Sequence, residues 1–192
     1  MRSNSLESKQ TLKKQLVEHY HWLRQYGCND SHSGNASFRW HNEIWLTPTG
    51  CCADTLQEND LIRCDIDGSM EEGASLDAPL HIQVYQQNPK TKAVMHSHGA
   101  HTIAITLKGD DFVPVDFEGQ YYFPNVPVIT IPYDRYIEQS PSAVATALKD
   151  HKVVVVKGHG VYACAESINL AYKWSCSVEL SAKIAWLARA PV

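Results

Sequence analysis

Apolar residues recur along this chain at two spacings, and each spacing predicts one kind of element. Apolar side chains three and four positions apart share one helical face and predict amphipathic helices. Short apolar runs, and runs that alternate with polar residues, predict strands between turns. The predicted helices cover residues 5–26, 77–88, 99–107, 140–148 and 165–190. The predicted strands cover residues 38–40, 43–47, 61–66, 93–98, 126–131, 152–157 and 161–164.

Helices and hairpin-forming strands are mixed along the whole chain, with no internal repeat and no linker. This order predicts a single α/β domain over residues 1–192, with a mixed, largely antiparallel central sheet. Ser140 and Pro141 are expected at the N-cap and N1 positions of the fourth helix. The aromatic segment 116–124 has no clear period, so we predict a loop with a functional or interfacial role.

The composition is that of a soluble globular protein and argues against two classes of partner. Hydrophobic residues make up 44% and charged residues 20% of the 192 positions. The net charge is −4 without a basic block, which argues against nucleic acid as a partner. No apolar run approaches the ~20 residues of a membrane span, and the first residues lack the apolar core of a signal peptide. The six cysteines show no Cys-x-x-Cys spacing, so we expect reduced thiols and a cytoplasmic location.

Three histidines stand where predicted strands end. His96 and His98 follow the apolar run 93–95 and share one face as residues i and i+2 of a strand. His159, between two glycines, follows a second apolar run at 153–156. Strand-end histidines are often ordinary surface or core residues, but three imidazoles with one open position form the ligand set of a catalytic zinc. The sequence therefore predicts a site for Zn²⁺ or another divalent metal.

Metal-assisted proton transfer also requires a nearby carboxylate. Asp77, at a predicted helix start, and Glu118, in the aromatic segment, are the two candidates. Each has an ordinary alternative, because Asp77 or Ser75 could cap the helix and Glu118 could be a solvated charge. The polar loops at 29–37 and 47–50 could turn backbone N–H groups toward an anion, or could be plain surface connections.

Five motifs together resemble one known family. They are Ser33-Gly34-Asn35-Ala36-Ser37, Thr47-Pro48-Thr49-Gly50, the segment 75–81, the segment 95–101 and Gly158-His159-Gly160-Val161. In order and spacing they are similar to the class II aldolase/adducin head family, which includes fuculose-phosphate aldolases, and the resemblance spans nearly the whole chain. It implies a three-layer α/β/α fold and a homotetramer with active sites between subunits.

The resemblance also implies roles for individual residues. The zinc ligands would be His96, His98 and His159. The substrate phosphate would be bound by Asn35, Thr49, Gly50 and Ser75. The catalytic groups would be Asp77, Glu118 and Tyr122. The last two fall where the family completes its site, often from a neighbouring subunit, and Tyr121 is a nearby alternative.

Two positions depart from the family pattern. Asp77 stands where the aldolases have a glutamate and the epimerases an aspartate, and its shorter side chain reaches differently toward the metal. Leu76 stands where a serine commonly bonds the phosphate, and one lost donor to a charged acceptor weakens binding by about 1.5–3 kcal/mol. The chain also ends soon after its last predicted helix, where the epimerases carry a catalytic tyrosine, which is expected to disfavour epimerisation.

The resemblance implies a zinc-dependent aldolase-type lyase that cleaves a small ketose phosphate or sugar-acid phosphate through a metal-stabilised enediolate. A decarboxylase, a dehydratase or a 4-epimerase of the same family would share this intermediate. The alternative of a different class is a non-catalytic, adducin-like binding module. The three histidines favour an enzyme, because a pure scaffold does not need converging imidazoles.

Overall fold

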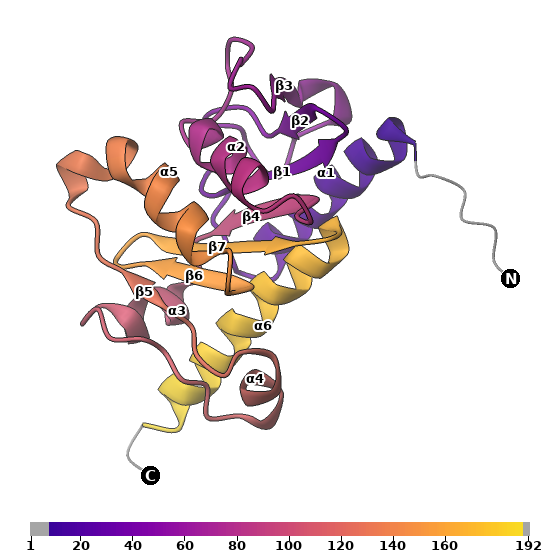
Figure 1. Ribbon diagram of the computed structural model, residues 1–192. Helices are drawn as coiled ribbons and strands as arrows, with labels where there is room; N and C mark the ends of the chain where they lie inside the picture. Colours follow the sequence, from indigo (N-terminus) through magenta and orange to yellow (C-terminus); the bar gives the residue numbers. More distant parts are fainter. Residues whose placement is uncertain (1–7, 190–192) are drawn as a thin grey trace, which may run out of the picture.

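The structure is a computed structural model that describes residues 8–189. Within this part, seven strands form one central sheet with helices on both faces (Figure 1). The strands are β1 (Asn35–Trp40), β2 (Glu43–Leu46), β3 (Ile62–Asp65), β4 (Ala93–Ser97), β5 (Val128–Ile129), β6 (Val153–Val156) and β7 (Gly160–Ala165). The helices are α1 (Lys9–Gln25), α2 (Ala78–Gln87), α3 (Ala100–Thr106), α4 (Phe117–Tyr122), α5 (Tyr136–Ala147) and α6 (Ile168–Leu187). Residues 5–7 and 190, which belong to the predicted first and last helices, lie outside the described residues.

The strand order of the sheet is β3-β2-β1-β4-β7-β6-β5. Every neighbouring pair is antiparallel except β5 and β6, which are parallel. The prediction of a mixed, largely antiparallel sheet is therefore confirmed. The register aligns Asn35 of β1, His96 of β4 and Tyr162 of β7 across three neighbouring strands. Residues directly opposite each other hold their side chains on the same face, so these three side chains form one row.

Two helical layers cover the sheet, which gives the three-layer α/β/α fold that the resemblance implied. Helices α1, α3, α4 and α6 lie on one face, while α2 and α5 lie together on the other (Figure 1). Alternate strand residues point to opposite faces. Accordingly Ala93 and Met95 join the core under α1 and α6, and Val94 joins the core under α2 and α5. By the same alternation His96 faces the α2–α5 layer.

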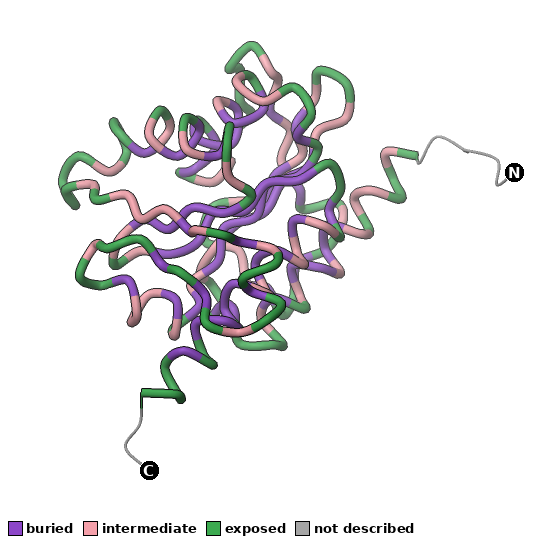
Figure 2. The backbone as a smooth tube through the Cα atoms, turned by 60° about the horizontal axis from the view of Figure 1, so that its bottom comes forward, coloured by how far each residue is buried: buried purple, intermediate pink, exposed green. Residues whose placement is uncertain are grey.

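The strands of the sheet are largely buried, whereas the outer surfaces of the helices are exposed. Figure 2 shows buried backbone through the central strands and exposed backbone along the outer turns. Large apolar side chains are nevertheless exposed on α4 and on the second half of α6, namely Phe117, Tyr121, Leu180, Trp186 and Leu187. No helix in the described part of the chain is long and apolar enough to cross a membrane.

The helix predicted to begin at Ser140 begins one turn earlier. Helix α5 starts at Tyr136, directly after a 3-10 helix at Tyr133–Arg135, so Pro141 lies inside it. The guanidinium of Arg135 donates to both carboxylate oxygens of Glu138 at 2.9 Å. This exposed pair adds about 0.2–0.5 kcal/mol to the first turn. Tyr136 in the same turn also donates a hydrogen bond to Asp77, so tertiary contacts hold the turn ahead of the Ser-Pro signal.

The segment 116–124, predicted to be a loop, contains helix α4. The carboxylate of Asp116 accepts a hydrogen bond from the N–H of Gly119 at 2.9 Å and caps this helix. A helix of six residues is too short for a hydrophobic period to be recognised. Strand β1 also begins earlier than predicted, at Asn35, because its first residues pair with β4.

Candidate metal centre and active-site pocket

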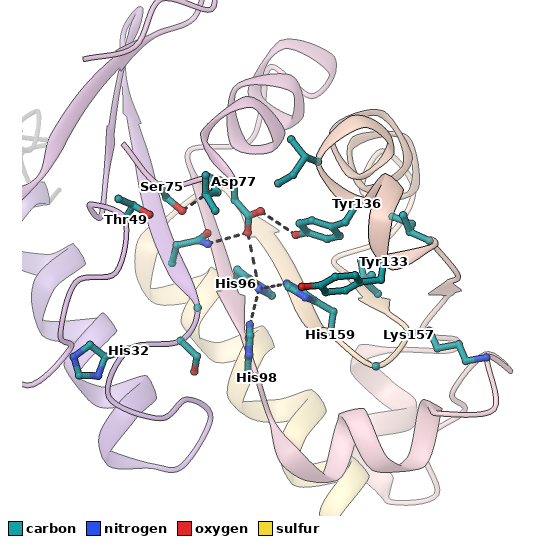
Figure 3. A pocket seen from close by; sticks show the side chains of 18 residues that line it. His32, Thr49, Ser75, Asp77, His96, His98, Tyr133, Tyr136, Lys157 and His159 are labelled. Atoms are coloured by element: carbon teal, nitrogen blue, oxygen red, sulfur yellow. Dashed lines mark hydrogen bonds and ion pairs between the residues drawn. The ribbon is translucent and has the colours of Figure 1, made fainter. Parts of the chain in front are cut away.

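The three predicted histidines converge at one point (Figure 3). The Nε2 atom of His96 lies 2.8 Å from Nε2 of His98 and 2.9 Å from Nε2 of His159. His96 is in β4, His98 follows the end of that strand, and His159 lies in the turn between β6 and β7. Among the described residues, these three form the group that converges closely enough to hold a metal ion, with ligand atoms within 4.8 Å of one another.

His96 is held with its Nε2 atom facing the other two histidines. Its Nδ1 atom lies 3.0 Å from the carbonyl oxygen of Val161, which can only accept, so Nδ1 carries the ring proton. The His96 ring stacks on that of Tyr162, with centroids 4.0 Å apart and planes 2° apart. A carbonyl on the far ring nitrogen is a usual support for a metal-binding histidine, because it fixes the tautomer and the ring orientation.

The turn that follows β4 is held by segments distant in sequence. The backbone N–H of His98 donates to Oδ1 of Asn29 at 2.8 Å. At the start of α3, the carboxylate of Glu179 accepts from the N–H groups of His101 and Thr102 at 3.1 and 3.0 Å. His98 is therefore placed from two sides, by the loop after α1 and, through the start of α3, by α6.

The histidine cluster suits a cation. Burial lowers the pKa of His96 well below its usual range, lowers that of His98 to about 4, and lowers that of His159. All three imidazoles are therefore neutral at pH 7, and each can offer a lone pair. With Nδ1 protonated, Nε2 of His96 carries a lone pair, and this lone pair faces the Nε2 atoms of His98 and His159 at 2.8 and 2.9 Å. Three neutral imidazoles are also the donor set of a catalytic zinc site.

Two glycines allow His159 to approach the strand that carries His96. Gly158 has a φ of +70°, which residues with side chains rarely adopt. A Cβ atom on Gly160 would lie 2.4 Å from the carbonyl oxygen of Ser97 and 3.0 Å from Cε1 of His96. No side chain fits at this contact, so close packing requires the glycine that follows His159.

We expect the Gly160→Ala variant to lose both stability and metal affinity. The added methyl group pushes β7 away from the end of β4, and overpacking of this kind costs about 1–3 kcal/mol. Thermal unfolding measures the first effect, and titration of the folded variant with Zn²⁺ measures the second. A folded variant that unfolds at the wild-type temperature and binds Zn²⁺ as tightly as wild type would show that the contact is not as close as the structure has it.

Asp77 lies beside the histidines at the start of α2 (Figure 3). Its Oδ2 atom is 3.9 Å from Nε2 of His96. The carboxylate accepts a hydrogen bond from the side-chain amide of Asn35 at 2.9 Å, and from the hydroxyls of Tyr162 and Tyr136 at 2.8 and 2.9 Å. Asp77 occupies the N-cap position of α2, as one of the two predicted alternatives had it, but its side chain makes no capping hydrogen bond and faces the histidines instead.

Asp77 is an anion at neutral pH in spite of its burial. Burial by itself raises the pKa of Asp77, but His96 and the hydrogen bonds from Asn35 and Tyr162 bring that pKa down to about 2. Burial and the negative charge of Asp77 raise the pKa of Tyr136 and of Tyr162. Both phenols therefore keep their protons and act as donors to the carboxylate.

The histidines and Asp77 open into a pocket of about 780 Å³. Of the residues expected to bind phosphate, Asn35, Thr49 and Ser75 line this pocket, whereas Gly50 is not one of the lining residues. Leu76 also lines the pocket and is 73% exposed. The departure from serine at this position therefore changes the pocket surface itself.

Comparison with known proteins identifies the family. The sequence model of the family described as Class II Aldolase and Adducin N-terminal domain matches residues 14–186. The chain belongs to this family. L-fuculose phosphate aldolase of Escherichia coli strain K12 is 27% identical over 179 residues, which cover 90% of this chain and 81% of the relative. L-ribulose-5-phosphate 4-epimerase of Salmonella paratyphi C is 25% identical over 196 residues, which cover 94% of this chain and 86% of the relative.

A solved structure of the same family supports the fold. The crystal structure of L-fuculose-1-phosphate aldolase from Thermus thermophilus is 27% identical to this chain and superposes with a TM-score of 0.86. The match covers 94% of this chain and 98% of the other. The seven-stranded sheet and its two helical layers are therefore those of a class II aldolase-type domain.

In this member of the aldolase/adducin family, Glu118 and Tyr122 do not line the pocket of their own chain. Both lie on α4, which packs against α6. Glu118 is exposed, and the ring of Tyr122 lies 5.3 Å from that of Trp174. A catalytic role for either residue therefore requires a second copy of the chain.

Sequence patterns did not predict the two tyrosines that hold Asp77 in this family member. Tyr162 falls in the predicted strand 161–164. A buried tyrosine hydroxyl usually has a hydrogen-bond partner, and this was the one feature of the sequence that could have indicated a polar contact here. Tyr136 precedes the predicted start of its helix and gave no signal. His32 and Tyr133 line the pocket as well and were also missed.

Proposed function

We propose that this protein is a zinc-dependent aldolase-type lyase that cleaves a small ketose phosphate or sugar-acid phosphate. The observation that carries the proposal is the convergence of His96, His98 and His159 beside the carboxylate of Asp77 in one pocket. The similar proteins named as L-fuculose phosphate aldolases support the same chemistry. An adducin-like binding module would have no use for this arrangement.

In this proposal each residue of the site has one task. His96, His98 and His159 hold Zn²⁺ through their Nε2 atoms. An ion held there would supply Lewis acidity, the chemistry that favours an enediolate next to a carbonyl. Asp77 accepts the proton of a substrate hydroxyl as the neighbouring carbon–carbon bond breaks, and its ionised state at neutral pH is the one that a base requires.

The substrate phosphate is proposed to bind at Asn35, Thr49, Gly50 and Ser75. These residues offer an amide, two hydroxyls and a backbone N–H, and neutral donors of this kind can hold an anion together. Three of the four line the pocket. Leu76 offers no side-chain donor where the family resemblance implies a serine. We therefore expect the phosphate to be bound less strongly than in a protein with serine at this position.

A 4-epimerase is the second candidate. Asp77 is the residue type that the family resemblance associates with epimerases, and an L-ribulose-5-phosphate 4-epimerase is among the similar proteins. Decarboxylation and dehydration next to a carbonyl would use the same residues, because they pass through the same kind of intermediate. The products separate these reactions: two carbonyl fragments, an isomer, CO₂ or an unsaturated product.

The proposal is tested by incubating zinc-loaded protein with a panel of ketose 1-phosphates, L-ribulose 5-phosphate and 3-oxo acid phosphates. Products are followed by NMR. We expect an aldehyde and a ketone phosphate from at least one ketose 1-phosphate. An isomer formed without cleavage would favour the epimerase instead. If zinc-loaded protein converts none of the compounds in the panel, the proposal of an enzyme is wrong.

We propose that the protein forms a homotetramer in which Glu118 and Tyr122 complete the pocket of a neighbouring subunit. The support is the surface around them, since Phe117 and Tyr121 on the same helix are 88% and 79% exposed. Large exposed aromatic side chains are typical of protein–protein contacts. A contact through α4 would cover these rings and carry Glu118 toward a partner.

Two inactive variants are expected to restore activity to each other within one assembly. Glu118→Gln keeps the histidines and loses the acid, whereas His159→Ala keeps the acid and loses a proposed zinc ligand. Random assembly gives about a quarter of the sites both intact halves, so co-expressed hybrids should recover about a quarter of wild-type turnover. Hybrids no more active than the separate variants would show that the pocket is not shared.

We also propose a cytoplasmic location and a single domain over residues 1–192. All six cysteines are free thiols, which agrees with a reducing compartment. The family match over residues 14–186 and the one continuous sheet support a single domain.

A further inference from the structure

Three side chains from three different elements donate hydrogen bonds to the carboxylate of Asp77. Its Oδ2 atom accepts from the amide of Asn35 at 2.9 Å and from the hydroxyl of Tyr162 at 2.8 Å. Its Oδ1 atom accepts from the hydroxyl of Tyr136 at 2.9 Å, and the two hydroxyls also contact each other. Donors from β1, β7 and α5 thus fix both oxygens of one carboxylate. Figure 3 shows the contact between Tyr136 and Asp77.

Oδ2 is the oxygen of Asp77 that lies 3.9 Å from Nε2 of His96. A carboxylate oxygen offers two lone pairs, and Oδ2 uses both, one for Asn35 and one for Tyr162. It can bind a metal ion only after one of these hydrogen bonds breaks. In agreement, the described side chains that converge closely enough to hold an ion are the three histidines, without Asp77.

Tyr162 contacts the proposed metal centre as well as the acid. It is fully buried, and its ring stacks on His96, its partner in the register of β4 and β7. The stacking therefore fixes the hydroxyl oxygen of Tyr162 beside Asp77, because this oxygen cannot move away unless the ring also moves off His96. Tyr136 lines the pocket, and its ring lies 4.6 Å from that of His159.

We propose that Tyr162 and Tyr136 are positioning residues that hold the Asp77 carboxylate beside the metal ion and prevent it from binding the ion. The three histidines would then hold the ion without the carboxylate, and the carboxylate would stay close enough to exchange a proton with the substrate. This inference rests on the proposed function, because it requires an ion at the three histidines.

The test is a titration with Co²⁺, whose coordination geometry depends on its ligands and whose visible absorption reports them. Tyr162→Phe keeps the ring that stacks on His96 and removes only the hydroxyl. We expect Asp77 to bind the ion in this variant, so that Co²⁺ binds about tenfold more tightly, whereas removing an outer-shell partner ordinarily weakens metal binding by about 10–100-fold. A gain in affinity therefore distinguishes a new ligand from a lost support. The visible spectrum should change as well. Adding Asp77→Asn to the variant should restore the wild-type affinity and spectrum.

Tyr85→Phe is the matched control. Tyr85 is equally buried, and its hydroxyl lies 2.7 Å from Oγ of Ser37, outside the pocket lining. The change in chemistry and burial is the same as in Tyr162→Phe, but Asp77 keeps all its donors. The Co²⁺ affinity and spectrum of this control should equal those of wild type.

Other results of the Co²⁺ titration would overturn the positioning role or the proposed function. A wild-type affinity and spectrum in Tyr162→Phe would overturn the positioning role, and so would a change that persists with Asp77→Asn. If Tyr162→Phe does not fold, the Co²⁺ affinity and spectrum are measured instead for Tyr136→Phe, with and without Asp77→Asn, because Tyr136 lies at the pocket surface. Wild-type protein that binds neither Co²⁺ nor Zn²⁺ overturns the proposed function and this inference together, whereas normal wild-type binding with an unchanged variant overturns the inference alone.

Discussion

The His96→Ala variant is expected to lose its metal ion and its activity. His96 lies between the other two proposed ligands, with its Nε2 atom 2.8 and 2.9 Å from those of His98 and His159. Two imidazoles hold zinc far less strongly than three, so we expect the affinity to fall by at least about 100-fold, beyond the range of outer-shell changes. Metal analysis of the purified proteins should find about one ion per wild-type chain and none per variant chain.

His151→Ala is the control for this experiment. His151 is half-buried just before β6 and does not line the pocket. Its variant should keep the metal content and the turnover of wild type. Full metal content in His96→Ala would refute the three-histidine centre. Circular dichroism of both variants shows whether a loss of metal follows from unfolding instead.

The Asp77→Asn variant should keep its metal ion and lose most of its activity. The amide has nearly the size of the carboxylate, and Asp77 stands 3.9 Å from His96, so the histidines are left in place. An amide cannot take up a proton as a carboxylate does, and general acid–base groups contribute about 10²–10⁴-fold to the rate. The measurements are kcat on the substrate that the panel identifies and zinc content by metal analysis.

Asp67→Asn, in the exposed turn after β3, is the control for Asp77→Asn. The same change of charge at this distant turn should leave kcat unchanged. Wild-type kcat in Asp77→Asn would mean that another group takes the proton. Loss of zinc in that variant would place Asp77 among the metal ligands, against the positions that its hydrogen bonds give it.

Much of the fold follows from local patterns in the sequence. The strands that contain the apolar runs at 93–95 and 153–156 form as predicted, because a short run between turn residues has few other ways to bury its side chains. Helix α4 escaped prediction because it has only six residues and is stabilised by the cap at Asp116. The first turn of α5 contains the pair Arg135–Glu138 and the contact of Tyr136 with Asp77, and a search for Ser-Pro starts overlooks both.

One part of the candidate site could be predicted from the sequence, and another part could not. The convergence of His96, His98 and His159 could be expected because each histidine stands at the end of an apolar run. The surroundings of Asp77 could not be expected, because they depend on which strands are neighbours. Only the register of β1, β4 and β7 puts Asn35 and Tyr162 on either side of His96, and no local pattern encodes that order.

Metal-dependent aldol cleavage is tested most directly by following the fragment that keeps the phosphate. Cleavage of a ketose 1-phosphate between its third and fourth carbons releases glycerone phosphate, which glycerol-3-phosphate dehydrogenase reduces with NADH. Zinc-loaded protein should release this fragment from at least one ketose 1-phosphate, stop when a chelator removes the metal, and resume when Zn²⁺ is restored. No release by protein that carries a full equivalent of zinc, or release that is indifferent to the chelator, would contradict the proposed function.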